Sequence, residues 1–215
     1  MKRLTCMFIL LASTLLHPVF AQEYVEATPA QRRQMQEQIA EATSRLSSLA
    51  CDFEQTKEIA IMNEKMQSSG RMFYRRENCV RWEYTTPYAY TFIYNNNRIA
   101  MQTEAGRSVI DVRSNALFQS IVKIMISSMN GSGMTDNKSF TPRFYIDGSG
   151  RRMVSLTPVQ KDVRKMFALI RLYFDGKDHS VETVVMEEPN GDATHIRLTN
   201  KRINEKIDDS RFTVD

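Results

Sequence analysis

Histidine, cysteine and catalytic motifs are scarce in this sequence. It holds three His and three Cys, and no Gly-x-Ser-x-Gly turn, His-Glu-x-x-His pair or phosphate-binding loop occurs in it. Beyond the N-terminal segment only His179 and His195 are found, and their positions do not match the ligand spacing of zinc sites. We therefore expect no enzymatic activity, no metal site and no cofactor.

Long hydrophobic runs and a strong excess of one charge are also absent. No apolar stretch beyond the N-terminus approaches the roughly 18 residues that a transmembrane helix needs. The 29 basic and 25 acidic residues give a formal net charge of +4, and the basic residues are scattered, so we expect no nucleic-acid partner. No linker rich in Gly, Ser or Pro divides the chain, which favours one domain.

The N-terminal segment has the order of a secretory signal peptide. Two basic residues precede the apolar run 4–16, and Val19 and Ala21 occupy the small-residue positions before a cleavage site. Cys6 precedes most of the apolar run, so it is not placed for lipid modification. We expect residues 1–21 to be removed and 22–215 to be secreted as one unanchored domain. Loss of the two basic residues lowers the formal net charge from +4 to +2.

The start of the mature chain is typical of an amphipathic helix. Thr28 and Gln31 have the spacing of a capping box around Pro29, and an apolar stripe follows at intervals of three and four residues: Met35, Ile39, Ala42, Leu46 and Leu49. From Cys51 the apolar period changes to two, which indicates a strand. Further strands are predicted at 67–76, 79–86, 88–95, 98–104 and 107–112.

The segment 114–130 is helical in pattern but apolar almost all round. We expect it to form a mobile lid, with Gly131 and Gly133 as its hinge. Strands are predicted after it at 142–147, 152–157, 163–174, 180–188 and 193–199. The sequence thus predicts an α+β fold, in which a long antiparallel sheet is interrupted by a hydrophobic helix.

The interior of such a fold has two interpretations. A twisted sheet faced by an apolar helix can enclose a cavity for acyl chains, and the thirteen Met residues suit varied apolar ligands. A close-packed two-layer core, with the same residues as filler, fits the pattern at least as well.

The stretch Gly70–Pro87 is the most informative part of the chain. Between Cys79 and Tyr84 large apolar residues alternate with polar ones, and the preceding run reaches an Arg-rich turn, so the stretch predicts a β-hairpin with one apolar face. This block and its surroundings resemble the LolA family of periplasmic outer-membrane lipoprotein carriers. The matching elements are Phe53-Glu54-Gln55, Gly70–Pro87, Leu156-Thr157-Pro158, Gly191 before Thr194-x-Ile196, and Asn200, Asn204, Ile207 and Phe212 in the tail.

The resemblance implies an incomplete, strongly curved antiparallel β-barrel, a half-barrel whose apolar cavity is covered by helices. It also implies a monomeric carrier that moves acylated lipoproteins from an inner-membrane releasing transporter to an outer-membrane acceptor, through transient contacts with both. The residues expected in the cavity and lid are Phe73, Arg76, Trp82, Tyr84, Phe92, Leu117, Ile121, Val122, Met125 and Met129.

Arg76 is assigned by its spacing within the family pattern, six residues after Gly70 and six before Trp82. In the family this arginine binds lid carbonyls and is needed for handing cargo on. Arg75 is an adjacent alternative for this role, and the other interpretation is that Arg76 is only a solvated turn charge. The family often has Pro after this arginine, whereas Glu77 follows here.

Cys51 and Cys79 both survive removal of the signal peptide and both enter an oxidising compartment. If the strand that starts near Cys51 pairs with the one that ends near Arg76, the two cysteines come close. We therefore expect a disulfide between them.

Two other functions are open. An envelope sensor of lipids or mislocalised lipoproteins could use the same fold, and a secreted lipid-modifying enzyme is a weaker alternative. Extracted lipid that is chemically unchanged would separate the two binding functions from the enzyme.

Overall fold

The structure, a computed structural model, describes residues 23–76, 79–114, 119, 122, 126 and 139–214. The predicted signal peptide and most of the predicted lid, including Leu117, Ile121, Met125, Met129 and both hinge glycines, lie outside these residues.

The described elements follow one another in a simple order. They are β1 (Tyr24–Glu26), α1 (Pro29–Arg45), β2 (Ser48–Ile59), β3 (Glu64–Arg75), β4 (Cys79–Thr86), β5 (Tyr90–Asn95), β6 (Arg98–Thr103), β7 (Gly106–Asp111), η1 (Val112–Ser114), β8 (Phe140–Asp147), β9 (Arg152–Pro158), α3 (Lys161–Met166), β10 (Leu169–Phe174), β11 (Val181–Glu187), β12 (Ala193–Ile203) and η3 (Asp209–Phe212).

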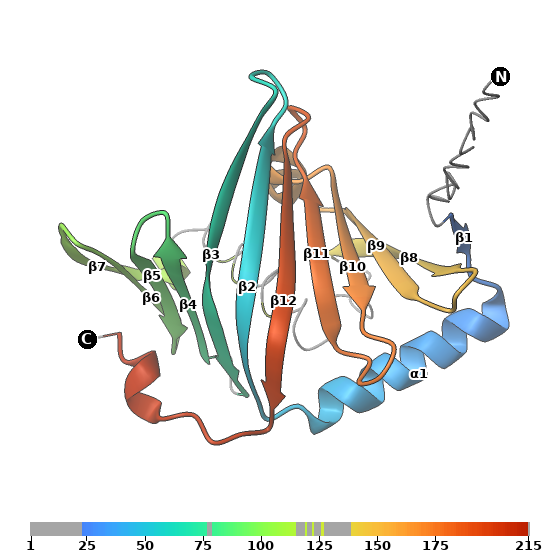
Figure 1. Ribbon diagram of the computed structural model, residues 1–215, viewed down its shortest axis with the longest axis horizontal. Helices are drawn as coiled ribbons and strands as arrows, with labels where there is room; N and C mark the ends of the chain where they lie inside the picture. The colour runs from blue at the N-terminus through green and yellow to red at the C-terminus, as the bar shows by residue number, and fades with distance from the viewer. Residues whose placement is uncertain are drawn as a thin grey trace, which may run out of the picture.

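The twelve strands of the described residues belong to one sheet, in the order β1-β8-β9-β10-β11-β12-β2-β3-β4-β5-β6-β7. Each pairing is antiparallel. The sheet is strongly curved and its two edges, β1 and β7, lie far apart (Figure 1). It is an open half-barrel, so the predicted fold class is confirmed.

Helix α1 begins as the sequence predicts. The Thr28 backbone N–H donates to Gln31 Oε1 at 2.9 Å, and Gln31 N–H donates to Thr28 Oγ1 at 3.4 Å, so the capping box is complete. Met35 and Ile39 are its buried residues. The predicted stripe was too long at its C-terminal end, because the helix stops at Arg45 and Leu49 belongs to β2.

The strand predicted at 163–174 is wrong in its first half. Residues Lys161–Met166 form the short helix α3, and β10 starts only at Leu169. Asp162 in the first turn and basic residues in the last turn favour this helix through the backbone dipole. Val163 is buried in the same cluster as Ile170 and Leu172, so helix and strand bury apolar groups in one place.

The register gives the sheet one apolar face, which we call the inner face. Directly paired residues share a face, and the pairs Leu172↔Val184, Val184↔Ile196 and Leu198↔Phe53 continue it from β10 to β2. Two large clusters lie on this face, one packed against α1 and one centred on β2–β6, and Val184 and Met186 contact both. The inner face is therefore one continuous apolar surface.

The opposite, outer face is mostly polar and is covered in part by the C-terminal segment. Phe212 packs with Ala50, Phe73 and Cys79, and Val214 packs with Ile93 and Ala100. The segment is held by side chains of the sheet, since Asn95 Nδ2 donates to the Phe212 carbonyl at 3.0 Å and Arg107 Nη2 to the Thr213 carbonyl at 2.7 Å.

Candidate functional site

Four aromatic side chains form the centre of the inner face. The ring of Phe53 lies 4.8 Å from that of Trp82 and 5.0 Å from that of Tyr84, and Tyr84 lies 5.7 Å from Tyr90. Phe53 is fully buried, whereas the other three are only partly buried at the edge of the cluster. This aromatic cluster offers ring surface to an apolar ligand without dismantling the core.

Gly70 makes this cluster possible. A Cβ at this position would lie 1.8 Å from the Glu83 carbonyl oxygen and 3.0 Å from Cε1 of Phe53. The pairing of β3 with β4 shifts between Ser69 and Gly70, which marks a bulge at this point. Because Gly70 has no side chain, the Phe53 ring can lie across β3 and reach Trp82.

One polar contact lies among the aromatic rings. The Tyr84 hydroxyl donates to Gln55 Oε1 at 2.9 Å. Burial, helped by the neighbouring Tyr90, raises the pKa of Tyr84 to about 12. The hydroxyl is therefore neutral at physiological pH and acts as a hydrogen-bond donor rather than a base.

Two residues of the predicted lid reach the inner face. Val122 is buried in the cluster of β2–β6, and Ile126 packs against the same cluster. Both residues are helical.

The C-terminal end of α1 is capped from elsewhere in the chain. Arg76 Nε donates to the Leu46 carbonyl at 3.1 Å, and its Nη2 donates to the Ser44 carbonyl. Asn204 Nδ2 donates to the Arg45 carbonyl at 3.0 Å. The last carbonyls of a helix have no partner within the helix, so Arg76 and Asn204 tie α1 to the sheet by satisfying them.

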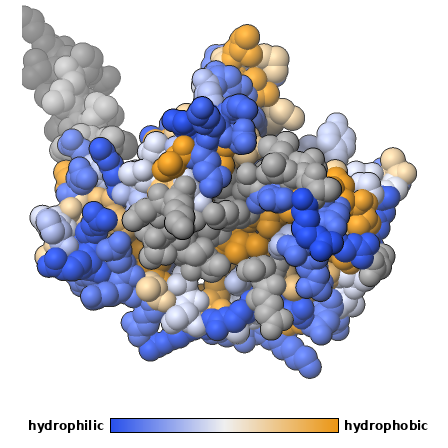
Figure 2. Space-filling view, turned by 180° about the vertical axis from the view of Figure 1, so that it is seen from behind, coloured by the Kyte–Doolittle hydropathy of each residue, from blue (hydrophilic) through white to orange (hydrophobic). Residues whose placement is uncertain are grey.

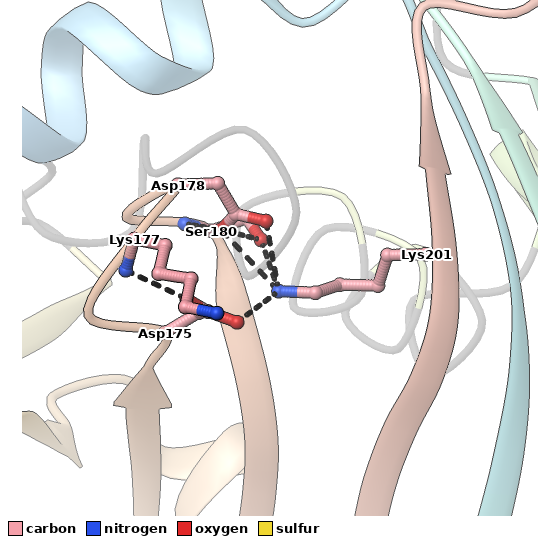
Figure 3. A network of polar contacts seen from close by, with 5 residues as sticks. All are labelled: Asp175, Lys177, Asp178, Ser180 and Lys201. Atoms are coloured by element: carbon pink, nitrogen blue, oxygen red, sulfur yellow. Dashed lines mark hydrogen bonds and ion pairs between the residues drawn. The ribbon is translucent and has the colours of Figure 1, made fainter.

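A cleft of about 310 Å³ lies beside this end of α1, bounded by the β10–β11 turn and the end of β12. At its wall the Lys201 ammonium contacts Ser180 Oγ at 2.7 Å, Asp178 Oδ2 at 3.1 Å and Asp175 Oδ2 at 3.2 Å (Figure 3). Lys201 lies within a register shift of β12, between Thr199 and Arg202. Because the Lys201 ammonium pairs with both aspartates, this network anchors the turn to β12.

Comparison with known proteins identifies the family. The sequence model of the family described as outer membrane lipoprotein carrier protein LolA matches residues 44–215. This chain belongs to the LolA family. An outer-membrane lipoprotein carrier protein of Chromohalobacter salexigens is 23% identical over 177 residues, which cover 82% of this chain and 80% of that protein.

Solved structures show the same fold at low sequence identity. An uncharacterized conserved protein from Thermus thermophilus aligns with a TM-score of 0.51 and 8% identity, over 84% of this chain and 91% of that one. MucB aligns with a TM-score of 0.50 and 12% identity, over 86% of this chain and 63% of MucB.

None of the described helices is long and apolar enough to cross a membrane.

The structure places the predicted cavity residues of this LolA-family chain on two faces. Trp82, Tyr84 and Phe92 lie on the inner face, together with Val122. Phe73 lies on the outer face, where it packs under Phe212 and the guanidinium of Arg211. Assigning Phe73 to the cavity was wrong, because Met72 and Tyr74, its neighbours in β3, already point inward.

The predicted disulfide is also wrong. Cys51 and Cys79 are free thiols, and both are buried. Cys51 pairs with Met72 on the inner face, whereas Cys79 pairs with Arg75 and packs with Phe73 on the outer face. The sheet itself separates the two sulfur atoms.

Among the residues of the site that were not predicted are Tyr90 of the aromatic cluster and three residues of the family pattern. Phe53 and Gln55 belong to the Phe53-Glu54-Gln55 motif, and Asn204 belongs to the tail, so the family pattern contained all three. The period-2 alternation of β2 places Phe53 and Gln55 on one face and could have assigned them to the cluster. The role of Asn204 depends on a contact across 159 positions of sequence.

Proposed function

We propose that this chain is a periplasmic carrier that holds the acyl chains of lipoproteins against its inner face and delivers them from the inner to the outer membrane without catalysis. Membership of the LolA family supports this role. The observation that carries it is the row of large, partly buried apolar side chains on the inner face: Trp82, Tyr84, Tyr90, Met101, Val184 and Met186.

The physical need for such a surface is large. Each methylene of an acyl chain contributes about 0.8 kcal/mol to membrane binding. A carrier must offset most of this free energy while the anchor is in water. A continuous apolar face can do so over the length of a chain, and the aromatic rings add flat contact area.

The inner face can be tested by two substitutions on one strand. Met101 of β6 points to the inner face, and the next residue, Gln102, is exposed on the outer face. Met101→Glu should abolish binding of a fluorescent fatty-acyl probe, because a carboxylate is costly to bury without a partner. Gln102→Glu introduces the same charge and should leave probe binding unchanged. Equal probe binding by both variants would contradict the inner-face assignment.

Arg76 is proposed to control release. It binds the carbonyls at the end of α1, and these contacts are proposed to break when cargo enters and to re-form when cargo leaves, so that they favour the closed state. Removing them should let cargo bind but should slow its transfer. Since one of these hydrogen bonds is exposed and the other is only partly buried, the cost in folding free energy should be about 1 kcal/mol.

Arg75 supplies the matched control for this proposal. It lies on the outer face, where it pairs with Asp209 and stacks on Phe212. We expect Arg76→Leu to accumulate in the periplasm as a cargo-bound complex, and Arg75→Leu to transfer cargo normally. Normal transfer by Arg76→Leu, or arrest by Arg75→Leu alone, would refute the assignment.

The place and partners of the carrier are part of the same proposal. Residues 1–21 are proposed to be cleaved, which N-terminal sequencing of the periplasmic protein tests directly. An inner-membrane releasing transporter and an outer-membrane acceptor are the proposed partners of a monomeric carrier. Mass spectrometry of the bound lipid and protein would show whether acylated lipoproteins are its cargo.

A further inference from the structure

The hairpin of β2 and β3 ends in an exposed apolar tip, which we define as Ile61, Met62 and Met66. Their exposed fractions are 92%, 54% and 56%. The hairpin projects beyond the neighbouring strands (Figure 1), and hydrophobic side chains gather at its end in the space-filling view (Figure 2).

The turn at this tip has unusual residues for an exposed loop. Met62 N–H bonds to the Ile59 carbonyl at 3.2 Å and Asn63 N–H to the Ala60 carbonyl at 3.3 Å, so Ile61 and Met62 occupy the middle of a tight turn. Such positions usually hold Gly, Pro, Asn, Asp or Ser. Only Asn63, with its φ of 50°, has the residue type that the backbone favours. The turn geometry therefore does not account for the apolar pair.

The base of the tip is tied to the neighbouring turn, and its lysines are paired with carboxylates. The Ala60 backbone N–H donates to Asp192 Oδ1 at 3.0 Å, which ties the hairpin to the β11–β12 turn. Lys65 pairs with Glu58 at 2.6 Å, and Lys57 pairs with Glu188. The tip is thus presented as a fixed apolar point without a cluster of unpaired cations beneath it.

The size and shape of the tip indicate what it contacts. A specific protein–protein interface takes about 800 Å² and 20 to 30 residues from each partner, far more than three side chains at a convex turn supply. A projecting apolar point can instead enter the headgroup and acyl boundary of a bilayer, where apolar side chains are stable at the interface. Unbranched Met side chains adapt to such fluid surroundings.

We propose that the tip of the β2–β3 hairpin inserts into the surface of a lipid bilayer and so brings the carrier to the membranes between which it works. This inference rests on the proposed carrier function for its purpose, but tip insertion and acyl binding are separate properties of different surfaces. Since the flanking lysines are paired, insertion should depend on the apolar side chains and little on lipid charge or salt.

Flotation of the mature protein with vesicles tests the proposal. The probes are vesicles of phosphatidylcholine, and of phosphatidylethanolamine with phosphatidylglycerol. The double variant Ile61→Ser and Met62→Ser should bind both at least about tenfold more weakly, since burial of each large apolar side chain is worth about that factor. Tyr88→Ser is the matched control, because Tyr88 is 81% exposed in the loop between β4 and β5. It should bind as the parent does, and both variants should melt with the parent.

A tryptophan at the tip reports its depth. Emission of Ile61→Trp should shift to shorter wavelength with vesicles and should be quenched by brominated phospholipids, whereas the parent, whose single Trp82 lies on the inner face, should show neither change.

Several results would overturn the inference. The parent protein could fail to float with vesicles, or the double variant could float as well as the parent. The parent could also lose its binding to phosphatidylcholine vesicles, or lose its binding to vesicles when salt is added. Finally, lipids could leave the emission of Ile61→Trp unchanged. If the parent protein sediments as a dimer and the double variant as a monomer, the tip would instead be a contact between two copies of this chain. Binding of the fatty-acyl probe is measured on the same samples and reports the carrier function separately. Membrane binding by the tip and acyl binding by the inner face can therefore fail independently of each other.

Discussion

Substitution of Gly70 by alanine should damage both stability and acyl binding. The new Cβ would stand 1.8 Å from the Glu83 carbonyl oxygen and 2.8 Å from its carbon. To lengthen the distance between the new Cβ and this oxygen to an ordinary contact of about 3.5 Å, β3 and β4 must separate by roughly 1.7 Å. Both clashing atoms belong to the backbone of β4, so no side-chain rotation relieves the strain. The cost should lie at the upper end of overpacking, about 3 kcal/mol.

This cost can be measured by thermal melting of the mature protein. A domain of this size loses about 2–4 °C per kcal/mol, so Gly70→Ala should melt about 6–12 °C below the parent. Gly176→Ala is the matched control, because nothing lies within 4 Å of the added Cβ, and it should change the melting temperature little. Displacement of the Phe53 ring from Trp82 should also weaken binding of the acyl probe. A Gly70→Ala protein that melts with the Gly176→Ala control would refute this account of the β3–β4 contact.

Three further results are expected. In the unfolded, unreduced mature protein Cys51 and Cys79 should titrate as two free thiols, while in the folded protein Cys51 should resist Ellman's reagent, because burial raises its pKa to about 12. Burial of Asp147 opposes its ionisation, but hydrogen bonds from Arg151 and Ser149 outweigh this effect and lower its pKa to about 2. The contribution of the Asp147 carboxylate to stability is therefore complete above pH ~4 and is lost as pH falls toward ~2. The melting temperature of Asp147→Asn should depend less on pH in this window than that of the parent. Lys201→Met leaves two carboxylates without their shared cation and should cost about 1–2 kcal/mol, less than for a fully buried pair because both aspartates are partly exposed; an unchanged chemical-denaturation midpoint would show that the network contributes nothing.

Local pattern determined much of this protein. The capping box around Thr28 and Gln31 was readable because both partners lie within one turn of chain. The alternation in the Gly70–Pro87 block predicted that Trp82 and Tyr84 share a face, since side chains in a strand alternate with period two. The family pattern then joined these segments into one half-barrel, which the strand order confirms.

Tertiary structure decided which residues meet. Cys51 and Cys79 are close in a diagram of paired strands, but the register places them on opposite faces of the sheet. The partners of Arg76 are carbonyls at the end of a helix about 30 residues earlier in the chain, and no sequence period reports such a contact. Lys201 meets its aspartates only because a register shift interrupts the alternation of β12. Periodicity thus determined the face of most side chains, whereas bulges, register and contacts between distant segments determined the site, because these depend on how the whole sheet pairs.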